Sequence, residues 1–349
     1  MPQLLFDCEK MKNPNTGLFE FCKQLGFALL KNKAADEEMI YYVPKQYQGF
    51  FGDNATYKKK NSLHKFCIPP NIKPDIWHTT FQSSRYMPST GRSKKVLTIH
   101  DLNCIHEKFP PQKIKRILHS VQDNINRADH VVTISQFVMD DVKTHLHLKD
   151  KPASVVLNAA HIEAYPDFDA PAYRPAQPFL FTIGGVNAKK NFHVLPPLLV
   201  GNDYELIIAG PVFDESYKQH IMVTAQKHGV ADRVTITGAI SYPEKYWYLR
   251  HCAGFLFPSI AEGFGLPVIE AMTLGKPCFL SNKTSLPEVG GPLSYYFQDF
   301  EPAHMQEVFN NGMQDYQKNN PSAAIKAHAA LFSYDNTAKG YLNVYRSLY

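Results

Sequence analysis

The sequence predicts an α/β fold made of two doubly wound, Rossmann-like domains. Three observations support this prediction. The chain has 349 residues, which is about twice the usual size of one compact domain. Short β-rich apolar runs alternate with longer segments of helical period, which favours parallel α/β units. Several of these runs end in Gly or Ser, where a doubly wound sheet gathers its ligand-binding loops.

The first domain is predicted to span residues 1–165. Its predicted strands are residues 96–100 (VLTIH), 130–135 (HVVTIS) and 153–160 (ASVVLNAA). The segment DLNCIHEKFPP after the first strand is interpreted as a loop, and QFVMDDVKTHL after the second as a helix. This half carries 23 Lys and Arg against 16 Asp and Glu, whereas residues 166–349 carry 14 against 16. The basic excess is therefore N-terminal.

A proline-rich segment without periodicity, residues 161–178, is predicted to be the interdomain linker. The second domain is predicted to span residues 166–331, and residues 332–349 to form a last helix. The predicted strands of the second domain are residues 179–185 (FLFTIGG), 204–210 (YELIIAG), 233–238 (RVTITG), 254–259 (GFLFPS) and 277–281 (PCFLS).

The stretch SIAEGFGLPVIE, residues 259–270, follows one of these strands directly. Gly263 and Gly265 allow positive φ and a close approach of the backbone to a ligand, and a proline suits a first helical turn. The amides of such a helix start form a site for an anion such as phosphate. Glu262 and Glu270 would repel the phosphate, so we expect them to accept hydrogen bonds from sugar hydroxyls.

Other features exclude several classes of protein. Six scattered cysteines without Cys-x-x-Cys spacing argue against disulfides and zinc. There is no leader-like N-terminus and no run of 18 uncharged apolar residues, so we expect a cytoplasmic protein. No basic module for nucleic acid is recognisable. Residues 45–66 interleave Tyr and Phe with lysines, which predicts peripheral contact with an anionic membrane; a solvated loop is the alternative.

The sequence resembles family 4 retaining glycosyltransferases, which have the GT-B architecture. PSIAEGFGLPVIEAM, residues 258–272, is similar to their paired-glutamate signature, and LGKPCFLSNKTSLPEVGG to the segment that follows it. Further similar segments occur in the family's order: TIHDLN, ADHVVTIS, NAAHI, IGGVNAKKN, IIAGP and VTITGAIS. The resemblance is weak over residues 1–75. It implies two Rossmann-like domains that face each other across a cleft, with the last helix returning to the N-terminal domain.

The resemblance also implies roles for residues of the second domain. Glu262 matches the glutamate that contacts hydroxyls of the donor sugar, and Glu270 the one that holds the ribose. Lys190 matches the lysine that grips the diphosphate, where a cation lowers the charge of the leaving group. The remaining expected donor contacts are Gly184, Gly185, Lys189, Gly263, Phe264, Gly265 and Leu266. Many members carry an arginine where this chain has Gly185, and Lys189 is the candidate substitute.

In the N-terminal domain the resemblance points to His100 and Asp101 as catalytic candidates at the end of a strand. The histidine of this family motif approaches the donor sugar or the reacting centre. Thr16 and Gly17, in NPNTGLFEF, are expected in a first turn beside the phosphates and the acceptor. Asn15 belongs to the same turn, and the match there is shorter than the family's usual double-glycine form.

We expect no cofactor and no metal. Asp167 and Asp169 form an Asp-x-Asp, a pattern that binds a divalent cation in another glycosyltransferase architecture, but they lie in the proline-rich segment and not at a strand end. Lys190 and helix amides would hold the diphosphate instead. No side chain stands out as an obligatory nucleophile, which suits a front-face retaining displacement in which the leaving phosphate takes the acceptor's proton.

The expected function is transfer of a hexose from a nucleotide sugar to a glycan, with a lipid-linked polysaccharide or lipopolysaccharide precursor as acceptor. GDP-mannose is the favoured donor, because the KKN loop without the usual arginine resembles bacterial mannosyl- and rhamnosyltransferases of surface-polysaccharide assembly. The alternatives are a UDP-sugar-dependent transferase of the same fold and a GT-B-like nucleotide-sugar epimerase, which needs no acceptor. A bilobal binding protein is disfavoured by the missing leader.

Overall fold

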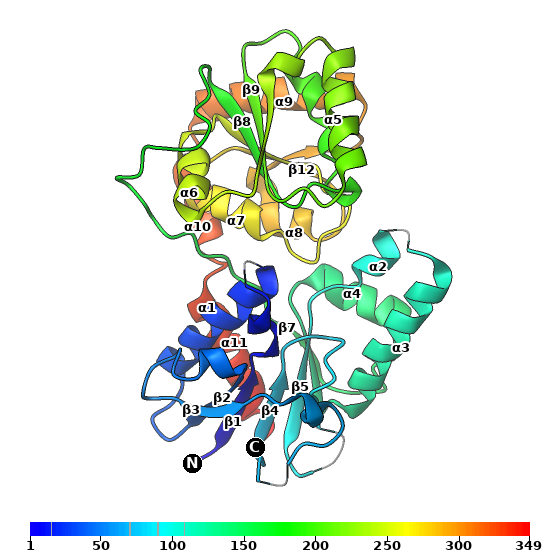
Figure 1. Cartoon of the computed structure of the whole chain (residues 1–349), viewed down its shortest axis with the longest axis vertical. Coiled ribbons are helices and arrows are strands. Elements are labelled where there is room, and N and C mark those ends of the chain that lie inside the picture. The colour runs from blue at the N-terminus through cyan, green and yellow to red at the C-terminus, as the bar shows by residue number, and fades with distance from the viewer. Residues whose placement is uncertain (15, 70, 89–90, 108) are drawn as a thin grey trace. The chain divides into compact units, whose positions relative to one another are not determined.

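A computed structural model describes residues 1–14, 16–69, 71–88, 91–107 and 109–349, which form two compact units. Unit 1 comprises Met1–Ala159 with Phe332–Tyr349, and unit 2 comprises Ala160–Leu331. The sequence predicts the first change of domain after residue 165 and the second after residue 331. Each unit is built on one parallel β-sheet with helices packed beside it (Figure 1).

The sheet of unit 1 has seven parallel strands in the order β3-β2-β1-β4-β5-β6-β7. The strands are β1 Gln3–Asp7, β2 Glu38–Val43, β3 Thr56–Lys59, β4 Ile76–Thr79, β5 Lys94–Ile99, β6 His130–Thr133 and β7 Ala153–Val155. The α-helices are α1 Gly17–Asn32, α2 Asn103–His106, α3 Pro111–Arg127, α4 Gln136–His145 and α11 Tyr334–Arg346. The 3-10 turns are η1 Glu9–Lys12, η2 Lys45–Tyr47 and η3 Ser62–Lys65. The strand order reverses between β1 and β4, where such a sheet opens a crevice at its carboxyl edge.

The larger hydrophobic core of unit 1 lies between its sheet and the helices α1 and α11. Leu25 and Leu29 of α1 and Leu342 and Tyr345 of α11 are buried against apolar residues of the strands. A smaller core combines Tyr86 with Leu5, Ile40, Tyr42 and Trp77, which point to the opposite face of strands β1, β2 and β4. The last helix therefore belongs to the N-terminal domain, as the resemblance implies.

An ion pair fastens α11 to the loop before β2. Arg346 donates from Nε and Nη2 to the carboxylate oxygens of Glu37 at 2.7 and 2.9 Å, and Tyr349 donates to the same carboxylate at 2.7 Å. The Glu37 side chain is only 3% exposed, whereas that of Arg346 is 40% exposed. The hydrogen bond from Arg346 is the main cause that lowers the pKa of Glu37 from 4.5 to about 2.

Arg346→Ala is expected to lower the free energy of unfolding at pH 7 by about 2 kcal/mol, because Glu37 loses its charged partner. A lowered pKa stabilises the fold above the unfolded value, and this term is lost as the pH falls from 4.5 towards about 2. Urea denaturation of wild type and variant should therefore give converging stabilities over that window. Lys339→Ala, on the exposed face of the same helix, is the matched control and should change little. A difference that stays constant down to pH 2.5 would rule out this pairing.

The sheet of unit 2 has six parallel strands in the order β10-β9-β8-β11-β12-β13. The strands are β8 Phe179–Ile183, β9 Glu205–Ala209, β10 Val234–Gly238, β11 Gly254–Phe257, β12 Cys278–Ser281 and β13 Tyr295–Phe297. The α-helices are α5 Glu215–Lys227, α6 Tyr242–His251, α7 Leu266–Thr273, α8 Leu286–Gly290, α9 Pro302–Asn319 and α10 Ser322–Ala329. The 3-10 turns are η4 Ala188–Lys190, η5 Phe192–Val194, η6 Pro196–Leu199, η7 Ala231–Arg233 and η8 Gly291–Leu293.

The proline-rich segment differs from the prediction, because it packs on unit 2 and does not merely connect the domains. Buried Glu205 at the start of β9 accepts hydrogen bonds from the Tyr173 hydroxyl at 2.5 Å and from the Ala176 and Gln177 amides at 2.7 and 2.9 Å. The carboxylate of Glu205 therefore holds the proline-rich segment on unit 2, although that segment has no hydrophobic periodicity.

Two local predictions in unit 1 also need correction. The segment after β5, interpreted as a loop, contains the short helix α2, and the long helix α3 begins at its last proline, Pro111. Strands β1 to β4 were not recognised, although β1, β2 and β4 are almost entirely buried. Among the described residues, no helix combines the length and the apolar character needed to cross a bilayer.

Candidate active site

The turn from β11 into α7 is shaped by glycine and by hydroxyl groups. Gly265, the N-cap of α7, has φ +116°, and a Cβ there would approach Leu286 Cδ2 to 2.8 Å. The loop before it is tied to the next turn of the chain. The Glu262 amide donates to Thr284 Oγ1 at 3.1 Å, and Ser285 Oγ donates to the carbonyls of Glu262 and Phe264 at 3.1 and 2.8 Å. Gly263 completes this loop, and Leu266 begins the helix.

Glu262 and Lys190, separated by 72 positions in the sequence, meet at this turn. Lys190 Nζ lies 2.5 Å from Glu262 Oε1, and both side chains are largely buried, at 12% and 14% exposure. The ammonium group also lies 4.7 Å from the centre of the Phe257 ring. Gly184 makes room for the lysine, because a Cβ there would lie 3.0 Å from Lys190 Cε. Three predicted residues are thus brought together.

Glu270 forms a second ion pair, with a lysine that the sequence did not single out. Lys245 Nζ of α6 lies 2.7 Å from Glu270 Oε1, and the two side chains are 17% and 11% exposed. The Ser241–Glu244 capping box marks the start of α6, yet no local pattern links Lys245 to position 270. Each glutamate of the signature therefore has a lysine partner, and the two carboxylates are compensated in charge.

The ring of Phe213 lies beside Gly185, where many family members carry an arginine. A Cβ at Gly185 would lie 2.4 Å from Phe213 Cε2, so the ring occupies the space in which any longer side chain would begin. The Phe213 side chain follows β9 and is 72% exposed, and its amide donates to Val186 O at 3.3 Å. Lys189 contributes through its backbone: its carbonyl accepts from the Ile260 amide at 2.9 Å, which ties the glycine-rich loop to the Glu262 turn.

The N-terminal candidates are in unit 1. Thr16 caps α1 by accepting from the Phe19 amide at 3.2 Å, and Gly17 is the first residue of that helix. Asn15 lies outside the described residues. Asp101 Oδ1 accepts from the Asn103 amide at 3.1 Å at the start of α2. Thr16 and Asp101 thus have local capping contacts.

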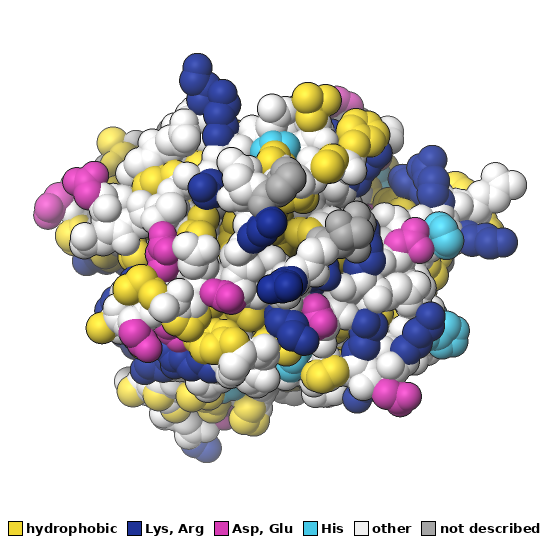
Figure 2. Space-filling view, turned by 90° about the horizontal axis from the view of Figure 1, so that it is seen from below, with side chains coloured by type: hydrophobic (Ala, Val, Ile, Leu, Met, Phe, Trp, Pro, Cys, Tyr) yellow, Lys and Arg dark blue, Asp and Glu magenta, His cyan; other side chains and the backbone are white. Residues whose placement is uncertain are grey.

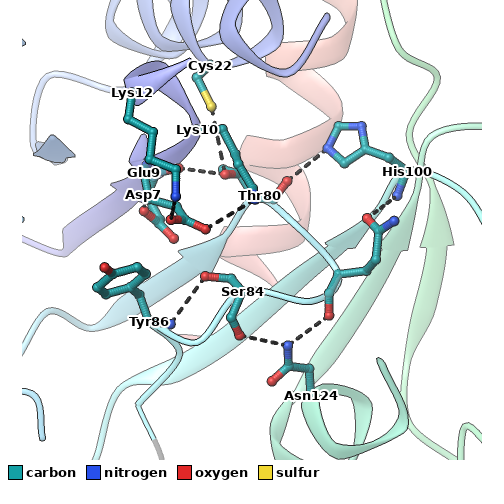
Figure 3. A network of polar contacts seen from close by, with 11 residues as sticks. Asp7, Glu9, Lys10, Lys12, Cys22, Thr80, Ser84, Tyr86, His100 and Asn124 are labelled. Carbon is teal, nitrogen blue, oxygen red and sulfur yellow. Dashed lines mark hydrogen bonds and ion pairs between the residues drawn. The ribbon is translucent and has the colours of Figure 1, made fainter. Parts of the chain in front are cut away.

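His100 closes β5, and its ring is almost buried, at 6% exposure (Figure 3). Its Nε2 lies 2.8 Å from the Thr80 carbonyl oxygen. Burial lowers the pKa of His100 from 6.5 to about 4, although the hydrogen bond to Thr80 acts in the opposite direction. The imidazole is therefore neutral near pH 7.

The described residues hold no cluster of three or more His, Cys, Asp or Glu side chains with the spacing of a metal site. In the Asp-x-Asp, Asp169 accepts from Trp247 Nε1 at 2.9 Å and pairs with Arg174 at 2.7 Å. The carboxylate of Asp169 is therefore engaged in contacts within unit 2.

Comparison with known proteins identifies the domain that carries the paired glutamates. Residues 167–324 match the family described as glycosyl transferases group 1. Residues 167–324 are thus similar to a group 1 glycosyltransferase domain. The predicted family and enzyme class are confirmed by this match and by relatives that carry the names of mannosyltransferases.

The chain is 29% identical over 241 residues to the serotype-specific mannosyltransferase WbdA of Escherichia coli, and the aligned region covers 61% of this chain and 28% of WbdA. It is 24% identical over 299 residues to the O-antigen chain mannosyltransferase RfbU of Salmonella typhimurium, covering 80% and 82% of the two chains. The aligned regions thus cover between 28% and 40% of the WbdA proteins that the chain matches.

A solved structure confirms the fold. The Anabaena protein HepE, in complex with UDP and glucose, superposes with a TM-score of 0.70 at 14% identity, covering 99% of this glycosyltransferase and 100% of HepE. The predicted architecture of two Rossmann-like parallel-sheet domains is therefore correct.

Proposed function

We propose that this glycosyltransferase moves a hexose, with retention of configuration, from a nucleotide sugar to a glycan acceptor. The observation that carries the proposal is the Lys190–Glu262 pair beside the glycine-rich turn. An arriving diphosphate competes with Glu262 for the ammonium group, because both are anions. Once Lys190 has moved to the diphosphate, the released carboxylate accepts hydrogen bonds from sugar hydroxyls.

The second ion pair contributes a contact to the ribose and stays intact. Glu270 is one turn into α7, and in the proposed complex it accepts hydrogen bonds from the ribose hydroxyls while Lys245 keeps its charge compensated. The backbone amides at the start of α7 add partial positive charge near the diphosphate. The site would then hold a nucleotide diphosphate with protein cations and amides, without a metal ion.

In the proposed reaction, the bond between the anomeric carbon and the diphosphate oxygen breaks as the acceptor oxygen bonds to the same face of that carbon. The acceptor's proton passes to the leaving phosphate oxygen, so atoms and charges balance without a side-chain nucleophile. Lys190 stabilises the negative charge that develops on the diphosphate, and this stabilisation is stronger in the transition state than in the ground state.

The proposed donor is GDP-mannose and the proposed acceptor a polysaccharide or lipopolysaccharide precursor. This choice is supported by relatives whose names are serotype-specific and O-antigen chain mannosyltransferases. A UDP-sugar is the second candidate, since the HepE structure contains UDP and glucose. Transfer is favoured over epimerisation by the group 1 glycosyltransferase match.

We also propose peripheral contact with an anionic membrane through unit 1. Leu63 and Phe66 are 70% and 77% exposed, and the Arg85 guanidinium lies 5.6 Å from the Phe66 ring. On the face shown in Figure 2, basic side chains are interspersed with apolar and acidic ones. If the purified protein does not co-sediment with anionic vesicles at low salt, the proposed membrane contact is wrong.

Thermal denaturation with GDP, UDP, ADP and dTDP and their sugar conjugates, with and without EDTA, tests the donor class. Ligands that bind the folded state raise the midpoint, and at equal concentration the tighter ligand raises it more. We expect the largest rise with guanine nucleotides, no effect of EDTA, and loss of most of the rise in Glu270→Ala. The matched control Glu215→Ala, on the exposed start of α5, should keep it. Absence of a rise with every nucleotide would overturn the proposed function, and turnover without an acceptor would indicate an epimerase.

A further inference from the structure

Four partly exposed aromatic rings lie side by side on the surface of unit 1. Two belong to helix α1 and two to the segment that follows β2. They form a continuous aromatic strip in the order Phe19, Tyr47, Phe50 and Phe27, with 5.8, 5.6 and 5.6 Å between successive ring centres. Phe27 and Phe50 are 41% and 37% exposed, and the other two are half-buried. The strip is therefore open to a ligand along its length.

The strip has a rigid base, because Phe51 fastens the segment after β2 to α1. Phe51 is 3% exposed, and its ring centre lies 5.0 Å from that of Phe27 and 4.1 Å from that of Tyr41, with which it stacks. A Cβ at Gly26 would lie 2.4 Å from Phe51 Cε1, so α1 admits this ring only at a glycine. The Phe51 amide also donates to the Tyr57 hydroxyl at 2.8 Å. The exposed rings are thus held in place before a ligand binds, which lowers the entropy cost of binding.

One end of the aromatic strip lies at the carboxyl edge of the sheet. Helix α1 follows the exit of β1, and the 3-10 turn η2 that contains Tyr47 directly follows β2. In a parallel sheet these exits share one edge, which is where such a fold binds its ligands. Phe19 is in the first turn of α1, and Phe27 is eight positions further along the helix, about 12 Å away. The strip therefore leads away from the ligand-binding edge and is longer than one sugar ring.

The polar surroundings of the strip are neutral overall. Residues 44–54 contain one lysine and one aspartate. On α1, Glu20 lies 3.9 Å from Lys23, so these two charges compensate each other. Gln46 and Gln48 flank Tyr47 in the chain, and both are exposed. Amide side chains donate and accept hydrogen bonds, as sugar hydroxyls do.

This combination suits a neutral carbohydrate and not an anionic membrane. A pyranose ring presents C–H groups on its faces, and these are attracted to the negative face of an aromatic ring. An anionic membrane attracts cations, and insertion needs apolar side chains that protrude. Leu63 and Phe66 protrude in this way, at 70% and 77% exposure, whereas the rings of the strip are recessed. The two surfaces of unit 1 therefore differ in shape and in charge.

We propose that the aromatic strip binds sugar units of an extended acceptor glycan, beyond the unit that receives the new sugar. The inference rests on the proposed function in one respect, that the acceptor is a glycan. Each further unit that stacks on a ring adds contact area without changing the reacting centre. Longer acceptors are therefore expected to bind more tightly than short ones, and the difference should depend on the rings of the strip.

Calorimetric titration of the full chain with α-linked mannose oligosaccharides of two, four and six units tests the strip without any donor. The wild type should bind the hexasaccharide more tightly than the disaccharide. The double variant Phe27→Leu with Phe50→Leu keeps apolar side chains but removes two flat rings. Loss of one aromatic contact weakens binding about 3- to 10-fold, so the hexasaccharide should bind about 10-fold or more weakly to this variant. Phe66→Leu, outside the strip, is the matched control and should bind as the wild type does. Equal hexasaccharide affinities in wild type and double variant would contradict the proposal.

The leucine variant also separates a sugar surface from a membrane surface. Leucine enters a bilayer about as favourably as phenylalanine does, but it has no aromatic face. Co-sedimentation with phosphatidylglycerol vesicles should therefore be the same in the wild type, in the leucine double variant and in Phe27→Ala with Phe50→Ala. If only the alanine double variant lost vesicle binding, the strip would be a membrane contact and the proposal would be wrong.

Kinetics with the same oligosaccharides as acceptors test the role in transfer. In the wild type, kcat/KM should rise with acceptor length, whereas in the leucine double variant it should be nearly independent of length. The disaccharide should react equally well with both proteins, and the donor KM should not change. An equal fall in kcat/KM for every acceptor would place the effect at the reacting centre and overturn the proposal. A wild-type chain that transfers no sugar from any nucleotide sugar would refute the proposed function, whereas the donor-free titration tests the strip by itself.

Discussion

Replacement of Lys190 by alanine is expected to lower kcat about 10²–10³-fold, which is the usual effect of removing one preorganised group that stabilises developing negative charge. Lys190 Nζ is the cation that lies beside Glu262 and next to the glycine-rich loop of β8. The transition state places additional charge on the diphosphate, so kcat should fall more than donor affinity does. Steady-state kinetics with saturating acceptor, with circular dichroism to confirm folding, measures the effect.

Two controls separate the catalytic role from a structural one. Lys218→Ala removes a lysine of the same unit that is 41% exposed and lies 3.6 Å from Glu215, and it should keep wild-type kcat. The double variant Lys190→Ala with Glu262→Gln removes both charges of the largely buried pair. If this second change restored activity, the loss in Lys190→Ala would come from an unpaired carboxylate, and the proposed contact with the diphosphate would be wrong.

Gly210→Ala is expected to lower the free energy of unfolding of unit 2 by about 3 kcal/mol or more, in the range reserved for strained backbone and steric conflict. Gly210 follows β9 with φ +136°, and a Cβ there would lie 2.0 Å from the carbonyl oxygen of Gly184. The backbones that leave β8 and β9 are therefore in direct contact, and one of them must shift. Denaturant titration should show the lower stability. Nucleotide binding should also weaken, because Gly184 borders Lys190.

Gly229→Ala is the matched control for this prediction. Its φ of +69° is also in the left-handed region, but a Cβ there would meet no atom within 4 Å. It should cost only about 1 kcal/mol, the conformational penalty for a residue other than glycine. Equal losses in the two variants would mean that backbone conformation alone matters, and that the approach of Gly210 to Gly184 is unimportant.

Most of unit 2 was predictable from the sequence, because its strands are short apolar runs that end at glycines or polar residues. The strands predicted near residues 179–185, 204–210 and 254–259 agree with β8, β9 and β11 to within two residues at each end. Unit 1 was less predictable. The strand β4 (IWHT) is only four residues long and contains a histidine, so it presents no clear period.

The candidate site divides in the same way. The sequence by itself determined the glycine turn before α7, the start of that helix at a Leu-Pro step and the spacing of Glu262 and Glu270, because these depend on backbone conformation within one short segment. Only the tertiary structure decided the partners. Lys190 and Lys245 meet the glutamates across 72 and 25 positions, and the His100 ring contacts a carbonyl 20 positions away. Such contacts depend on how distant elements pack, since a local pattern determines where the backbone turns and not which side chains it will face.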